Sequence, residues 1–172
     1  VEAFSDARVR LIRQPNLGKA RALQNAVAHA NSEIFIFADA DTQFDREALR
    51  YLVGALENEK NGAVSGQARV GNPRTFAARC QEIEYLCNFN LDRRAYAAWN
   101  CITVVPGAIS AIKREAIEAA GGISLDTLAE DTDLTLAIHR AGYRVEYAPQ
   151  AIAFTEAPET FSQLARQRFR WA

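Results

Sequence analysis

The 172-residue sequence contains no methionine, only three cysteines and almost no net charge. Its formal net charge of −1 gives no general attraction to nucleic acid or anionic lipid, so we expect no nucleic-acid partner. The cysteines, Cys80, Cys87 and Cys101, are odd in number and lack CxxC spacing. We therefore expect reduced, mostly buried thiols and no disulfide or cysteine metal site.

The sequence also lacks a signal peptide, because residues 1–10 are polar and of mixed charge. The stretch 95–112 has no ionisable side chain apart from Tyr96 and Cys101, and it is close to the minimum length of a membrane-spanning helix. Pro106 and Gly107 would break such a helix. We therefore predict a helix end, a turn and a strand in this stretch.

Apolar patterning predicts strands and helices that mostly alternate. Strands are expected at 8–13, 33–38, 62–70, 108–112, 143–147 and 152–154, and helices at 19–30, 46–57, 75–99, 114–120, 131–141 and 160–172. With 49% hydrophobic and 24% charged residues, the range 1–172 is expected to form a single globular domain. The alternation implies an α/β, Rossmann-like fold with a mainly parallel sheet and helices on both faces. Ligands in such sheets bind beyond the carboxyl ends of the strands.

Two acids, Asp39 and Asp41, directly follow the apolar strand predicted at 33–38. In extended backbone, residues two apart point the same way, so their carboxylates would converge. Close like charges repel unless a cation lies between them. Mg²⁺ or Mn²⁺ prefers oxygen ligands and shares itself with phosphates. The alternative is a solvated turn before a helix, although Asp45 already supplies a cap for that helix.

Three more acids, Glu130, Asp131 and Asp133, lie at the start of a predicted helix. The helix macrodipole favours acids at this end, which is a sufficient structural reason for them. The functional alternative is a carboxylate that acts as general base toward an acceptor hydroxyl. Spacing alone leaves both interpretations open.

The last predicted helix places Gln167, Arg170 and Trp171 on one face. An amide, a guanidinium and an indole together suit a phosphate and a sugar ring. The alternative is an amphipathic helix at a membrane or partner surface.

Weaker signals come from single residues. Lys19 follows a turn glycine at a helix start, where phosphate can bind, and Gly107 can let a sugar approach the backbone closely. His29 and His139 are isolated on predicted helices, and we interpret both as surface or packing residues.

Taken in order, these motifs resemble glycosyltransferase family 2, which has the GT-A fold. The subgroup that they most resemble is the membrane-embedded polysaccharide synthases that make cellulose, chitin, hyaluronan or poly-N-acetylglucosamine. The matching segments span almost the whole chain: Asn16-Leu17-Gly18-Lys19, Ala22-Leu23-Gln24-Asn25, Asp39-Ala40-Asp41-Thr42, Pro106-Gly107-Ala108, Glu130-Asp131, Asp133-Leu134-Thr135 and Gln167-Arg168-Phe169-Arg170-Trp171.

The resemblance implies an inverting transfer from a nucleotide-sugar donor, expected to be a UDP-sugar, to a growing polysaccharide or other saccharide acceptor. Asp39 and Asp41 would hold the donor diphosphate through Mg²⁺ or Mn²⁺, with Asp41 the more direct ligand. Asp131 would be the catalytic base, and Glu130 would shape the acceptor site. The other implied contacts are Lys19, Gln167 and Arg170 to the diphosphate, and Trp171 and Gly107 to the acceptor sugar.

The sequence departs from the family pattern in two ways. Ala129 stands where the family usually has threonine before the Glu-Asp pair. The family's first nucleotide-binding strand would precede Val1, and its transmembrane segments would flank the chain. The absence of methionine and the abrupt ends also suggest a piece of a longer protein. We therefore expect a GT-A-type domain with a truncated N-terminal strand region, weakly active or inactive alone.

In the full protein, this domain is expected at the cytoplasmic face of a membrane. Three alternatives remain at this point: a non-processive transferase to a lipid or small acceptor, a sugar nucleotidyltransferase, and a non-catalytic module that binds a nucleotide-sugar.

Overall fold

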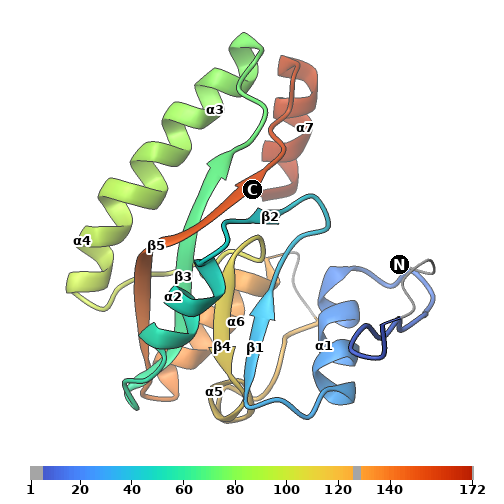
Figure 1. Cartoon of the computed structure of the whole chain (residues 1–172), viewed down its shortest axis with the longest axis vertical. Helices are drawn as coiled ribbons and strands as arrows, with labels where there is room; N and C mark the ends of the chain where they lie inside the picture. Colours follow the sequence, from blue (N-terminus) through green and yellow to red (C-terminus); the bar gives the residue numbers. More distant parts are fainter. Residues whose placement is uncertain (1–5, 126–128, 172) are drawn as a thin grey trace.

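The computed structural model describes residues 6–125 and 129–171, apart from the side chains of Arg170 and Trp171. Figure 1 shows its elements in chain order from blue to red. They are α1 (Lys19–His29), β1 (Ile34–Phe37), β2 (Gln43–Phe44), α2 (Ala48–Ala55), β3 (Asn61–Val70), α3 (Phe76–Leu86), the π-helix η1 (Cys87–Asp92), α4 (Arg93–Ala98), β4 (Ser110–Lys113), α5 (Arg114–Ala119), α6 (Glu130–Arg140), β5 (Arg144–Thr155) and α7 (Phe161–Trp171).

The strands form one five-stranded sheet in the order β1-β4-β3-β5-β2. β3 and β5 are parallel neighbours, whereas β4 is antiparallel to β1 and β3, and β2 is antiparallel to β5. The predicted α/β class is confirmed, but the sheet is mixed and not mainly parallel. The reason is the connection before β4, which returns the chain to the carboxyl end of β1, where Ser110 pairs with Phe37. β4 must therefore run back between β1 and β3.

Alternate residues of β1 face two separate cores, so helices cover both faces of the sheet as predicted. Phe35 and Phe37 pack with apolar residues of α1, α5 and α6. Ile34 and Ile36 pack on the other face, with α2 and the α3–η1 segment. This arrangement leaves the residues just beyond Phe37 at the end of the sheet.

Four predicted elements differ from the structure. Residues 8–13 form no strand, and Val9 and Leu11 are 44% and 48% exposed. Among the described strands, β1 pairs with β4 alone, so segment 8–13 has no paired neighbour in the sheet. The helix predicted at 75–99 contains the π-helical η1, and the strands predicted at 143–147 and 152–154 are one bulged strand, β5.

The stretch 95–112 comprises the end of α4, a loop and β4, as predicted. Within the described ranges, no helix combines the length and the apolar character needed to cross a membrane.

Cys80, Cys87 and Cys101 are free thiols, but Cys87 and Cys101 are exposed, so the prediction of mostly buried cysteines is wrong. Leu91 and Trp99, which are close to these cysteines in the sequence, are also exposed.

We predict that Leu52→Ala lowers the free energy of unfolding by about 2–5 kcal/mol, because Leu52 is fully buried between α2 and the sheet. Leu49→Ala on the same helix is the matched control, since Leu49 is 47% exposed. It should change the free energy by no more than about 0.5 kcal/mol. Urea unfolding curves measure both values. Equal losses in the two variants would contradict the assignment of this core.

Candidate active site

The chain turns sharply directly after β1. The Thr42 N–H donates to the carbonyl oxygen of Asp39 at 3.0 Å, which closes a four-residue turn. The extended backbone on which we based the convergence of Asp39 and Asp41 is therefore absent. Asp39 Oδ1 contacts the Lys19 ammonium at 2.6 Å. Asp41 is exposed on the turn, where its charge reaches Tyr85 of α3.

Lys19 links the Asp39 turn to the start of α6. Its ammonium lies 2.6 Å from Asp39 Oδ1 and 3.7 Å from Glu130 Oε1. Burial favours the neutral amine, but the hydrogen bond and charge of Asp39, with the charges of Glu130 and Asp131, outweigh burial and raise the pKa of Lys19. The structure therefore brings four of the predicted side chains into one charged cluster.

Gly107 lies against this cluster. A Cβ atom at position 107 would come within 2.5 Å of Lys19 Nζ and 3.6 Å of Asp39 Oδ1. Glycine thus leaves the room in which the lysine reaches its carboxylate partner. The sequence predicted that Gly107 allows close approach of a sugar, and the structure shows close approach of Lys19.

The first turn of α6 carries Glu130 and Asp131. The Glu130 side chain is only 12% exposed, and the Thr132 N–H donates to Asp131 Oδ1 at 2.8 Å. The macrodipole stabilises negative charge at this end of a helix, by about 0.3–1 kcal/mol for each acid. The negative charge of Asp131 favours the protonated forms of both Lys19 and Arg93, although burial lowers the pKa of Arg93 overall.

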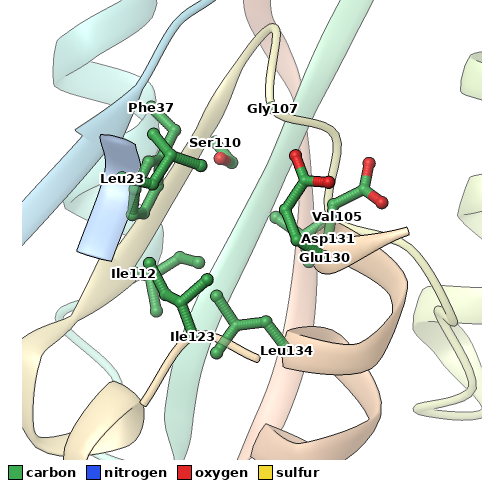
Figure 2. A pocket seen from close by; sticks show the side chains of 10 residues that line it. All are labelled: Leu23, Phe37, Val105, Gly107, Ser110, Ile112, Ile123, Glu130, Asp131 and Leu134. Carbon is green, nitrogen blue, oxygen red and sulfur yellow. The ribbon is translucent and has the colours of Figure 1, made fainter. Parts of the chain in front are cut away.

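Figure 2 shows the two acids at the start of α6, with both carboxylates on the side of the loop that carries Gly107. Beneath them lies a small cavity of about 20 Å³ with a mainly apolar lining. Its wall includes Leu23 of α1, Phe37 of β1 and Leu134 of α6. This volume holds about one water molecule. A ligand larger than a water molecule therefore does not fit inside this cavity.

The last helix, α7, packs beside α3. Arg168 forms an ion pair with Glu84 of α3, and the Gln167 side-chain oxygen is buried without a hydrogen-bond partner among the described residues. Burial raises the pKa of the neighbouring Tyr85; the charges of Glu84 and Asp41 add to this rise, and that of Arg168 opposes it. This half of α7 thus lies near the Asp41 turn. The predicted contacts of Arg170 and Trp171 lie outside the described residues.

His29 is a surface residue and His139 is a half-buried packing residue, as predicted. His29 Nδ1 is 2.8 Å from the carbonyl oxygen of Asn25, and His139 Nε2 is 2.8 Å from that of Ile102. The sequence did not reveal Arg93 and Tyr147, which are buried and close enough for their charges to interact. No local pattern marks either residue, because their neighbours come from other elements.

The fold and the site together define an α/β domain whose acids gather at the end of its sheet. Across its whole length, residues 1–172, the chain matches the family described as "Glycosyltransferase like family 2". The chain therefore belongs to glycosyltransferase family 2.

Two curated relatives illustrate the range of the family. The chain is 36% identical over 175 residues to the probable glycosyltransferase YdaM of Bacillus subtilis, an alignment that covers 99% of this chain and 42% of YdaM. It is 31% identical over 160 residues to the poly-beta-1,6-N-acetyl-D-glucosamine synthase of Staphylococcus aureus, covering 92% of this chain and 39% of the synthase. The chain thus spans about two fifths of the length of these relatives.

Solved structures confirm the GT-A type of fold. The mannosyltransferase PcManGT from Pyrobaculum calidifontis, in complex with GDP-Man and Mn²⁺, superimposes with a TM-score of 0.68 at 30% identity, covering 88% of this chain and 40% of PcManGT. The glucosyl-3-phosphoglycerate synthase of Mycobacterium tuberculosis, in complex with Mn²⁺ and UDP, gives a TM-score of 0.52 at 21% identity, covering 86% and 50%. The second likeness bears on the fold alone.

Proposed function

We propose that the domain catalyses an inverting, metal-dependent transfer of a sugar from a nucleotide-sugar to a saccharide hydroxyl. The observation that carries this proposal is the single cluster formed by Asp39, Lys19, Glu130 and Asp131 around Gly107. The cluster combines carboxylates that can bind a cation, an ammonium group that can bind a phosphate, and a carboxylate that can accept a proton. The GDP-Man and Mn²⁺ bound by PcManGT support the same donor chemistry.

Asp41 and Asp39 would hold Mg²⁺ or Mn²⁺. In the described ranges, no group of three or more His, Cys, Asp or Glu side chains could hold a metal ion. Two carboxylates nevertheless fit, because Mg²⁺ is usually bound through one or two carboxylates together with substrate phosphates. The ion, when bound, offsets the negative charge of the leaving diphosphate. Lys19 contributes a further positive charge at the same place.

Asp131 accepts the proton of the acceptor hydroxyl as its oxygen attacks the anomeric carbon. The new C–O bond forms on the face opposite the bond to the diphosphate oxygen. That bond breaks with its electron pair, nucleoside diphosphate leaves and the configuration inverts. Glu130 shapes the acceptor side of the cluster, and Gly107 leaves the room that Lys19 needs beside Asp39. Gln167 and Arg170 reach the diphosphate, and Trp171 stacks on the acceptor sugar.

For the acceptor, we propose a growing polysaccharide, because a poly-N-acetylglucosamine synthase is among the relatives and the Gln167–Trp171 motif is present. UDP-sugars are the corresponding donors. In the whole protein, the domain would lie at the cytoplasmic face of a membrane through segments outside this chain. Transfer to a lipid or small acceptor is the alternative to polysaccharide synthesis.

The test is release of nucleoside diphosphate from a donor panel of UDP-N-acetylglucosamine, UDP-glucose and GDP-mannose, with an oligosaccharide acceptor. We expect one donor to be preferred, with activity that is lost in EDTA and restored by Mn²⁺ or Mg²⁺. The preparation is the longest native chain that contains this domain. The proposed metal dependence is wrong if turnover continues unchanged in EDTA. The transferase itself is refuted if no donor is consumed.

A further inference from the structure

The loop between α4 and β4 crosses the site with open space on both sides. Val105 borders the apolar cavity of about 20 Å³ beneath the acids of α6. On the α4 side, Ile102, Thr103 and Val104 border a second pocket of about 180 Å³. Close packing normally fixes buried segments in proteins. Because this loop borders two cavities, its position depends more strongly on directional contacts.

Such contacts meet at one peptide group. Arg93 Nη1 donates a hydrogen bond to the carbonyl oxygen of Val104, and the N–H of Val105 donates to Thr135 Oγ1 at 2.9 Å. This oxygen and this N–H belong to the same planar peptide unit. The unit is therefore held at one end from α4 and at the other end from α6.

Arg93 is itself held firmly. Its Nη1 also donates to Ser65 Oγ at 2.7 Å, and its guanidinium lies 4.7 Å from the centroid of the Phe89 ring. It is the buried residue of α4, only 9% exposed, and directly follows the π-helix η1. π-Helical segments often occur at functional sites. Burial lowers the pKa of Arg93 to about 10, so the side chain keeps its charge at neutral pH.

Thr135 connects the same peptide unit to the proposed base. Its hydroxyl donates to the carbonyl oxygen of Asp131 at 2.6 Å and accepts from Val105. Two residues beyond Val105, Gly107 lies against the Lys19–Asp39 pair. One short segment therefore joins the base side of the cluster to its diphosphate side.

We propose that Arg93 and Thr135 are positioning residues that clamp the Val104–Val105 peptide and thereby set Gly107 and the Lys19–Asp39 pair at a fixed distance from Asp131. The catalytic consequence rests on the proposed transferase function. The clamp itself does not, since it is a property of the folded chain. A displacement of about 1 Å in a site of this kind can lower a rate about 100-fold.

The test compares Thr135→Val, which keeps the branched shape and removes the hydroxyl, with Thr135→Ser, which keeps the hydroxyl. We expect Thr135→Val to lower kcat about 10- to 100-fold, with the donor KM changed less than about 2-fold, because the Lys19–Asp39 contact itself remains and only its distance from Asp131 changes. Exchange of the Val105 amide hydrogen should become at least about 10-fold faster as its acceptor is lost. Thr135→Ser should stay close to the wild type in all three measurements.

Ile138→Val is the control for a general loss of stability, because Ile138 is fully buried on the same helix and makes no part of the clamp. Arg93→Met should act like Thr135→Val, and the double variant should lose less than the product of the two single losses, because both act on one peptide. Val105 exchange in Thr135→Val equal to that in Ile138→Val would overturn the clamp. Faster exchange with unchanged kcat would overturn its catalytic role. Absence of transfer by the wild type would refute the proposed function and the catalytic role, while the exchange data would still decide the clamp.

Discussion

Asp131→Asn is expected to lower kcat for sugar transfer about 1,000-fold, within the range that a general base contributes. The amide keeps the shape of the side chain, and its oxygen can still accept the Thr132 N–H that Asp131 accepts at 2.8 Å. It cannot take a proton from an acceptor hydroxyl. The loss corresponds to about 4 kcal/mol in activation free energy. Steady-state release of nucleoside diphosphate measures it, and nucleotide binding by calorimetry should stay unchanged.

Asp133→Asn is the matched control. Asp133 lies in the same first turn of α6, so both variants remove one negative charge from the positive end of one helix. A helix-terminus effect alone would give similar, small losses in the two variants. A base at position 131 predicts a large loss for Asp131→Asn alone. Near-normal turnover of Asp131→Asn would exclude Asp131 as the base.

The sequence was sufficient for most of the helices and strands, because these depend on local patterns. The apolar run before Asp39 is a strand, and the acids at 130–133 begin a helix. Strand direction was not predictable in the same way. β4 is a short apolar segment whose direction depends on where the preceding loop returns the chain, and the pattern of apolar residues is the same in both directions.

The details of the site were less accessible because they depend on contacts between distant segments. Lys19 was a weak signal in the sequence, yet it bonds to Asp39 and lies close to Glu130, more than one hundred positions away. The hydrogen bonds that hold the Val104–Val105 peptide could not be predicted from the sequence for the same reason. Arg93 looks like an ordinary helical arginine until the fold buries it against Ser65 and Phe89.

These contacts give Asp39 and Asp41 different expected roles. Asp39 is already neutralised in part by Lys19, because their charged atoms are 2.6 Å apart. A cation approaching Asp39 meets the positive charge of this lysine. Asp41 is exposed, and none of the ion pairs described here joins its carboxylate to a lysine or arginine. The carboxylate of Asp41 should therefore dominate the affinity for the cation.

Asp41→Asn is thus expected to weaken binding of UDP in the presence of Mn²⁺ about 100-fold, equivalent to about 2.7 kcal/mol. Binding of UDP in EDTA should change little, since the metal-independent contacts remain. Calorimetric titration of the protein with UDP, with and without Mn²⁺, separates the two components. Asp45→Asn is the control, because Asp45 is exposed after the same turn and its side chain accepts only the nearby Glu47 N–H among its assigned hydrogen bonds. Unchanged Mn²⁺-dependent binding in Asp41→Asn would show that the cation is held elsewhere. A loss of the same size in both variants would point to the net charge of the turn, and not to coordination by Asp41.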